Sequence, residues 1–166
     1  ISAGADYIML PMIKKIDDVE FVTKKIKGRS RFIPLIETVY SFMNLENIIN
    51  IEGVDEIYIG LNDLHLEYNL KFMFEPLANG MLDKAAELLS KRGIPFGFGG
   101  IARAGEGVLP GELVLAEHLR LGSSMVILSR TFMWSFLEKS TLESSLKSEL
   151  EKLRFFEEKL EKRDAK

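Results

Sequence analysis

Two acidic residues in this sequence are placed where they could share a divalent metal ion. Glu37 directly follows the apolar run Phe32–Ile36, and Asp63 follows the run Ile57–Asn62. We expect both runs to be neighbouring parallel strands, whose C-terminal ends carry the chemistry of α/β enzymes. Such strands lie roughly 4.8 Å apart, so two carboxylates at matching heights favour a shared Mg²⁺ or Mn²⁺ with oxygen ligands. Alternatively, one acid caps a helix N-terminus and the other pairs with a Lys or Arg.

A glycine-rich segment and nearby polar residues form a second group of candidates. The segment Gly97–Gly107 follows a buried apolar run, and glycine lets backbone N–H groups approach an anion closely. Within it, Arg103 could add a bidentate contact. Ser129 and Arg130 follow the last apolar run and are expected on the same side of the sheet. The alternative is a surface loop that ends at Pro110.

The two histidines are expected to have different roles. His65 lies two residues after Asp63, so it could orient a ligand or act as a base, or it could be a loop histidine with its hydrogen bonds satisfied. His118 lies in the middle of a predicted helix, and we expect it to be a surface or packing residue.

These residues require a particular set of elements to position them. A helical segment, a glycine, one or two polar residues and a short apolar run recur along the chain. The runs predict strands buried on both faces of a parallel sheet: Tyr7–Met12, Phe32–Glu37, Ile57–Gly60, Phe96–Gly99 and Met125–Leu128. Helical faces are predicted between them: Val19, Phe21, Val22 and Ile26; Leu82, Ala85, Ala86 and Leu89; Leu113, Leu115, Ala116 and Leu119. The pattern therefore indicates an α/β fold of right-handed βαβ units.

The pattern alone leaves two architectures open, a doubly wound sheet and a closed barrel. The first strand is followed by Pro11–Lys15 rather than by the G-x-G-x-x-G of a dinucleotide-binding sheet. The tail from Thr141 to Lys166 is heavily charged and predicts a helix with an apolar stripe of Leu142, Leu146, Leu150, Leu153, Phe156 and Leu160. This helix packs on its own domain or reaches another subunit.

Three segments carry a resemblance to a known family. Gly4–Met12, Ile36–Thr38 and Ile59–Leu64 resemble, in order and spacing, consecutive strands of the HpcH/HpaI aldolase and citrate lyase β-subunit family. The resemblance covers most of residues 1–135 and implies a (β/α)₈ TIM barrel. By that alignment this chain carries strands 4–8 plus a C-terminal helix, so residues 1–140 form the C-terminal part of the barrel and residues 141–166 the helix. It further implies that sequence upstream of Ile1 supplies an Arg that stabilises an enolate.

The resemblance also implies the chemistry. In the family, acids at the positions of Glu37 and Asp63 hold Mg²⁺ (or Mn²⁺), which chelates pyruvate or oxaloacetate and stabilises the enolate formed on bond cleavage. We expect substrate contacts from Asn62, Gly99, Gly100, Arg103 and Ser129, with His65 as a further catalytic candidate. This chain departs from the family at Leu35, Asn62 and His65, where Gln, a small residue and Ser are common. These departures leave the substrate and the exact reaction open.

Three functions are open on this basis. The first is a metal-dependent carbon–carbon lyase acting on a 2-keto acid or on an acyl-CoA thioester. The second is phosphoenolpyruvate chemistry, because Gly60–Leu64 is similar to a segment of those enzymes, although they normally need a phosphorylatable His and several Arg. The third is a non-catalytic barrel fragment or assembly subunit.

Composition narrows the range of partners. The formal net charge of -3 gives a polyanion such as nucleic acid no general attraction. The chain has no cysteine, which excludes disulfides, thiolate metal sites and a cysteine nucleophile, and suits the reducing cytoplasm. No apolar run approaches the roughly 20 residues of a membrane span. We therefore expect a small-molecule substrate, no nucleic-acid or membrane partner, and a homo-oligomer.

Overall fold

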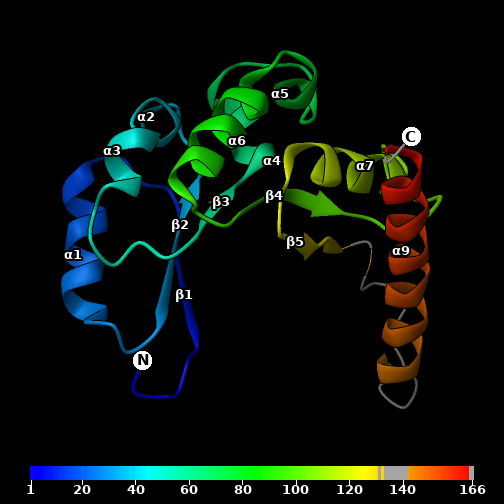
Figure 1. Cartoon of the computed structure of the whole chain (residues 1–166). Helices are drawn as coiled ribbons and strands as arrows, with labels where there is room; N and C mark the ends of the chain where they lie inside the picture. Colours follow the sequence, from blue (N-terminus) through cyan, green and yellow to red (C-terminus); the bar gives the residue numbers. More distant parts are fainter. Residues whose placement is uncertain (131, 133–141, 165–166) are drawn as a thin grey trace. The chain divides into compact units, whose positions relative to one another are not determined.

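The computed structural model describes residues 1–130, 132 and 142–164. The chain divides into two compact units, Ile1–Gly99 (unit 1) and Gly100–Lys166 (unit 2), and the boundary falls within a strand. Figure 1 colours the elements along the sequence.

Five strands follow one another in the sheet in the order of the chain. They are β1 (Tyr7–Leu10), β2 (Arg31–Ile36), β3 (Ile57–Ile59), β4 (Phe96–Ile101) and β5 (Met125–Leu128). The pairs β1–β2, β2–β3 and β3–β4 are parallel. The predicted strands are thus confirmed with ends that differ by at most two residues. A doubly wound sheet reverses its strand order, whereas consecutive order without reversal is the arrangement of a βα barrel.

Helices connect the strands, as expected for βαβ units. In unit 1 they are α1 (Ile16–Ile26), α2 (Val39–Met43), α3 (Leu45–Ile49), α4 (Leu61–Glu67), α5 (Glu75–Ala78) and α6 (Met81–Arg92). Helix α1 contacts β2, and Figure 1 shows α1 on the side of that strand. Helix α1 has acids in its first turn and lysines in its last, which complements its dipole. The core of unit 1 is fully buried around Phe32, Ile57 and Leu82.

Two of the three predicted helical faces need correction. Leu82, Ala85, Ala86 and Leu89 are all buried, as predicted. On α1, however, Val19 and Ile26 are buried while Phe21 is 62% exposed. On the helix that follows β4, Leu113 is 54% exposed and the buried residues include Val114 and His118. Adjacent apolar residues lie about 100° apart on a helix, so the sequence pattern allowed Phe21 to be added to the buried face of α1 and Leu113 to be chosen in place of Val114.

The outermost strands also differ from the prediction that every strand is buried on both faces. Tyr7 and Met9 of β1 are 49% and 39% exposed, and Ile127 of β5 is 46% exposed. Strands β1 and β5 stand at the two ends of the strand order, where only one neighbour covers them. The central strand β3 is buried at all three residues.

Unit 2 contains the end of β4, helix α7 (Gly111–Leu121), strand β5 and the long helix α9 (Leu142–Asp164). The predicted C-terminal helix is confirmed over these residues, while Thr141 and residues 165–166 lie outside the described ones. Figure 1 shows α9 beside α7, which it contacts. In the described part of the chain, none of the helices has the length and apolar character that crossing a membrane requires.

Candidate functional site

Glu37 follows the last residue of β2, and the backbone after it is held by several hydrogen bonds. Thr38 caps α2: its Oγ1 accepts the backbone N–H of Ser41 at 3.0 Å, and its own N–H donates to the Ser41 hydroxyl. The Thr38 hydroxyl is 2.6 Å from the Ile13 carbonyl oxygen, to which it donates. The end of β2 is thereby tied to the loop that follows β1, so the position of Glu37 is fixed.

The Glu37 carboxylate is buried and receives one backbone hydrogen bond. Only 4% of the residue is exposed. Its Oε1 accepts the N–H of Met12 at 2.8 Å. Met12 has a positive φ of 51°, an uncommon conformation for a side chain of its size. This turn after β1 aims a main-chain donor at the acid.

Gly60 brings β3 unusually close to the same carboxylate. A Cβ atom at this position would lie 2.8 Å from Glu37 Oε2 and 2.9 Å from Glu37 Cβ. Since φ of Gly60 is -82°, the glycine is needed for space and not for backbone conformation. The strand ends of β1, β2 and β3 therefore converge on Glu37.

Asp63 stands at the third residue of α4, the helix that begins directly after Gly60. Its side chain is exposed. Burial raises the pKa of the Glu37 carboxyl, the Met12 N–H lowers it, and the negative charge of Asp63 raises it again. The two carboxylates thus lie close enough for one to act on the ionisation of the other.

Among the described residues, no Lys, Arg or His lies within 4.0 Å of either carboxylate in an ion pair. Thr38, and not an acid, caps α2, and no side chain caps α4. The alternative of one capping acid and one ion-paired acid is therefore not what these residues form. A buried carboxylate with an acidic neighbour and no basic partner suits a cation.

The donor set available to such a cation consists of two carboxylates. The described residues contain no cluster of three or more His, Asp or Glu side chains that could hold a metal. Zn²⁺ sites usually supply three or four protein ligands, whereas Mg²⁺ is commonly held by one or two carboxylates with water and substrate completing the shell. The residues present fit Mg²⁺ or Mn²⁺ better than Zn²⁺.

The other predicted site residues of unit 1 lie in positions that support a role beside Glu37 and Asp63 less well. Asn62 is exposed in the first turn of α4. His65 is also helical, and two positions along a helix turn the side chain about 200° away from that of Asp63. His65 Nδ1 is buried and has no hydrogen-bond partner within the described residues. Gly99 has a φ of 59°, and its carbonyl accepts the hydroxyl of Tyr58, so it shapes the end of β4.

In unit 2, the predicted anion-binding residues take part in internal contacts. Arg103 donates from Nε and Nη2 to the Phe132 carbonyl oxygen, at 3.1 and 2.6 Å. The N–H of Gly105 donates to Glu112 Oε2 at 2.8 Å, so a carboxylate of the chain itself occupies that part of the loop. The Ser129 N–H donates to the Ile101 carbonyl at 3.0 Å. A Cβ at Gly100 would be 3.7 Å from the Ile127 carbonyl oxygen, which is ordinary contact.

His118 is a packing residue, in agreement with the sequence. It is 4% exposed, and its Nδ1 lies 2.7 Å from the Ser123 hydroxyl. Burial lowers its pKa to about 4, so the ring is neutral at physiological pH.

Two contributors to the site escaped sequence reasoning. Met12 acts through its backbone N–H, which no residue type signals. Gly60 was predicted only as the end of a strand, although a glycine between a buried run and an acid-bearing helix is a signal of close approach.

We expect Gly60→Ala to destabilise unit 1 by about 1–3 kcal/mol, because the added methyl group overlaps Glu37 Cβ, which cannot rotate away. Urea unfolding followed by circular dichroism measures the effect. Gly100→Ala is the matched control. That glycine also lacks a positive φ, but a Cβ added there would meet its nearest atom at 3.7 Å, an ordinary contact distance. Equal unfolding midpoints for the two variants would contradict the close approach described for Gly60.

Comparisons with known proteins give likeness in structure only. The sequence matches no protein-family model, and the comparison with curated proteins gives no match. An HpcH/HpaI aldolase from Desulfitobacterium hafniense DCB-2 superposes with a TM-score of 0.60 at 15% identity, over 76% of this chain and 57% of that one. An HpcH/HpaI aldolase/citrate lyase family protein from Burkholderia cenocepacia J2315 gives 0.63 at 16% identity, over 92% and 66%.

The citrate synthase SbnG is similar as well, with a TM-score of 0.64 at 20% identity, over 89% of this chain and 66% of that one. This chain thus spans less than two thirds of the length of each of these three solved structures. At such identities the likeness establishes the fold. The sequence-based resemblance is confirmed at that level: the chain has the fold of part of an HpcH/HpaI aldolase or citrate lyase family structure.

Proposed function

We propose that this protein is a divalent-metal-dependent carbon–carbon lyase, or a synthase running the reverse reaction, that acts on a 2-keto acid. The observation that carries the proposal is the Glu37 carboxylate. It is buried where three consecutive strands end, it has no basic partner among the described residues, and the charge of Asp63 raises its pKa. The fold shared with aldolases and a citrate synthase supports the same chemistry.

Glu37 and Asp63 would hold Mg²⁺ or Mn²⁺, and the rest of the site would serve this pair. The Met12 N–H donates to one oxygen of Glu37 and so fixes the rotation of the carboxylate. Gly60 leaves the space in which the other oxygen lies. When bound, the metal ion supplies positive charge that binds the keto acid and stabilises the negative charge developing as the carbon–carbon bond breaks.

The exposure of Asp63 gives the two acids different roles. Glu37 is held rigidly in the interior, while Asp63 stands in the first turn of α4, where the helix dipole favours a negative charge. A rigid inner ligand with an open outer one leaves coordination positions for water and a small chelating substrate. A 2-keto acid has the carboxylate and carbonyl oxygens to chelate in this way.

The test combines metal binding with turnover, in the full length that the gene encodes. Calorimetric titration with Mn²⁺ should give one site per chain, and oxaloacetate should yield pyruvate only when Mg²⁺ or Mn²⁺ is present. Bound metal with phosphate released from phosphoenolpyruvate, and no pyruvate from oxaloacetate, would favour phosphoenolpyruvate chemistry instead. A protein that binds no divalent metal would refute the proposal and favour an assembly role.

A further inference from the structure

The loop between β1 and α1 is held by side chains of the segment that follows β2. Besides the main-chain N–H that this loop donates to Glu37, its Ile13 carbonyl accepts the Thr38 hydroxyl at 2.6 Å. Ile16, the first residue of α1, donates its N–H to the Tyr40 hydroxyl at 3.3 Å. The backbone is therefore fixed on both sides of the two residues between these points, directly beside the proposed metal site.

Those two residues are lysines with different surroundings. Lys15 lines a pocket between the loop and α1 that also contains Asp17 and Asp18, so two acids stand near its charge. Lys14 is exposed and is not part of that lining. Its backbone N–H donates to Asp18 Oδ2 at 3.4 Å, but in the described part of the chain its ammonium group makes no hydrogen bond or ion pair. Lys14 therefore presents a positive charge that the loop itself does not compensate.

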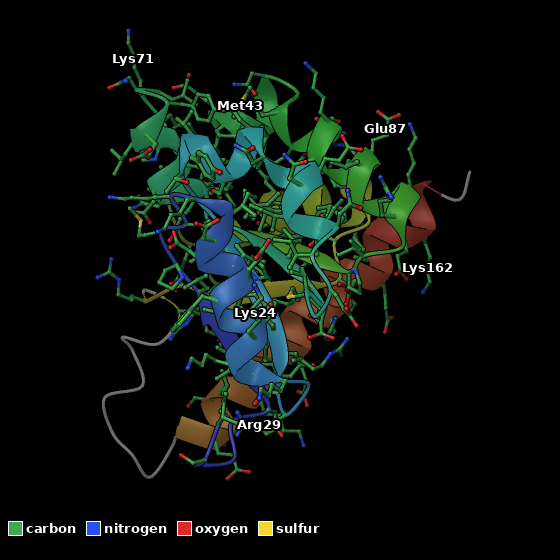
Figure 2. The ribbon with its side chains drawn as sticks, turned by 90° about the vertical axis from the view of Figure 1, so that its left-hand side faces the viewer. Lys24, Arg29, Met43, Lys71, Glu87 and Lys162 are labelled. Atoms are coloured by element: carbon green, nitrogen blue, oxygen red, sulfur yellow. The ribbon has the colours of Figure 1, made fainter. Side chains whose placement is uncertain are left out.

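Lys14 lies at the end of unit 1 that carries the proposed metal site. Two residues of chain span at most about 7 Å, so the Cα atom of Lys14 lies within that distance of the Cα atom of Met12, whose N–H binds the buried acid. Figure 2 shows the two ends of unit 1: Met43, the last residue of α2, and Lys71, which follows α4, stand at one end, and Arg29, which precedes β2, stands toward the other. A long side chain from the β1–α1 loop can therefore reach a substrate group that extends away from the metal.

The anion that suits Lys14 is a carboxylate and not a phosphate. Phosphate sites usually combine several main-chain N–H groups or a bidentate Arg. In this loop the N–H groups of Met12, Lys14 and Ile16 are already used, and no Arg occurs between β1 and α1. A single ammonium on a flexible stem acts as a point charge, which one carboxylate matches.

We propose that Lys14 binds a second carboxylate of the substrate, so that the site takes dicarboxylic 2-keto acids in preference to monocarboxylic ones. The inference rests on the proposed function, because a metal ion held by Glu37 and Asp63 would bind the keto-acid end and leave the other end of the molecule to Lys14. Since the lysine is exposed, the preference is modest and is weakened by salt.

The first test compares two keto acids of equal chain length, 2-oxoglutarate and 2-oxopentanoate, which differ only in a terminal carboxylate or methyl group. Calorimetric titration of the full-length protein loaded with Mn²⁺ should give about three- to tenfold tighter binding of 2-oxoglutarate. Lys14→Met should abolish this preference and leave the affinity for 2-oxopentanoate unchanged. Lys14→Glu should reverse the preference, because it places like charges together, and Lys14→Arg should retain it.

Two matched variants separate a specific contact from the general field of the loop. Lys15→Met removes the neighbouring charge, which shares its pocket with two acids, and Lys27→Met removes an exposed lysine at the other end of α1. Both should keep the preference for 2-oxoglutarate. A second readout is acetylation of the lysines followed by mass spectrometry: with Mn²⁺ present, 2-oxoglutarate should protect Lys14 and not Lys15 or Lys27, and 2-oxopentanoate should protect none of the three.

Equal affinity of the wild type for the two keto acids, or a preference that Lys14→Met leaves intact, would overturn the assignment of Lys14 while the proposed lyase function stands. An equal loss of preference in Lys15→Met would also overturn it, because the charge of the loop as a whole would then be responsible. If the protein loaded with Mn²⁺ binds neither keto acid, the proposed function fails and the role of Lys14 fails with it. Unchanged Mn²⁺ affinity in Lys14→Met ensures that a lost preference reflects the lysine and not the metal site.

Discussion

Glu37→Gln and Asp63→Asn should each reduce the proposed metal-dependent lyase activity by about 10³-fold or more, with the fold retained. Each substitution removes one negative charge at nearly constant volume. The amide oxygen that Glu37→Gln introduces can still accept the Met12 N–H, so the surrounding hydrogen bonds persist. Steady-state assays at saturating Mg²⁺, together with Mn²⁺ titration, separate loss of metal from loss of structure.

Two other acids provide matched controls for these variants. Glu56 is also buried, 7% exposed, but precedes β3 and pairs with Arg31 at 3.0 Å. Glu56→Gln should therefore cost stability without affecting metal affinity. Glu67→Gln changes an exposed acid on the same helix as Asp63 and should change neither. Full activity in Glu37→Gln, or equal loss in all four variants, would remove these acids from the proposed site.

The raised pKa of Glu37 adds a pH signature. Its carboxyl takes up a proton at higher pH in the folded chain than in the unfolded chain, because burial and Asp63 disfavour the charge. Without metal, the wild type therefore loses stability as pH rises from the ordinary glutamate value of about 4.5 through the folded pKa. Glu37→Gln lacks this loss and should melt at an equal or higher temperature at neutral pH.

Mg²⁺ should reverse that order. At the proposed site the ion would compensate the buried charge and stabilise the wild type in proportion to its occupancy, whereas Glu37→Gln would gain nothing. Melting curves at pH 4 to 8, with EDTA or with Mg²⁺, measure both effects. Below the ordinary glutamate pKa, the two proteins should converge with or without metal. A variant that is less stable than the wild type in EDTA would indicate a structural role for Glu37 instead.

The fold was largely predictable because its signals are local. Gly28, Gly93 and Gly122 stand at the ends of helices with positive φ, and each precedes a short apolar run that is a strand. The sequence could not settle which apolar residues of a helix are buried, as the exposed Phe21 and Leu113 show. Where two apolar residues are adjacent, the helical periodicity fits either of them. The sequence also left open whether the strands belong to a barrel or to a doubly wound sheet, and the strand order of the structure was needed to choose between them.

The acidic residues of the site could be predicted from the sequence, but the residues that position them could not. Glu37 and Asp63 follow buried runs, which is a sequence signal for the C-terminal ends of strands. That α4 begins at Leu61 was missed, and this placed His65 in a loop beside Asp63 instead of on another side of a helix. The burial of Glu37, the Met12 donor and the space at Gly60 arise from contacts between separate strands, which spacing along the chain does not encode.

The prediction from the sequence and the structure differ most in the glycine-rich segment around the end of β4 and the start of α7. The sequence left two roles open for these glycines, admission of an anion and a surface loop that ends at Pro110. The structure gives Gly111, which follows Pro110, a packing role. A Cβ on Gly111 would lie 2.3 Å from the Ala102 carbonyl oxygen and 2.7 Å from that of Arg103. Both are backbone atoms, so no side-chain rotation can relieve the overlap. The first residue of α7 must therefore be glycine for the helix to meet the end of β4.

Gly111→Ala should accordingly destabilise unit 2 by about 3 kcal/mol or more, at the upper end for overpacking. Hydrogen exchange should show faster exchange in α7 and β5, with α1 and β2 of unit 1 changed least. Gly100→Ala, whose Cβ has a 3.7 Å contact, should shift neither unit by more than about 1 kcal/mol. If Gly111→Ala keeps its stability and loses only affinity for an anionic substrate, the loop serves binding first and the packing role assigned to Gly111 is wrong.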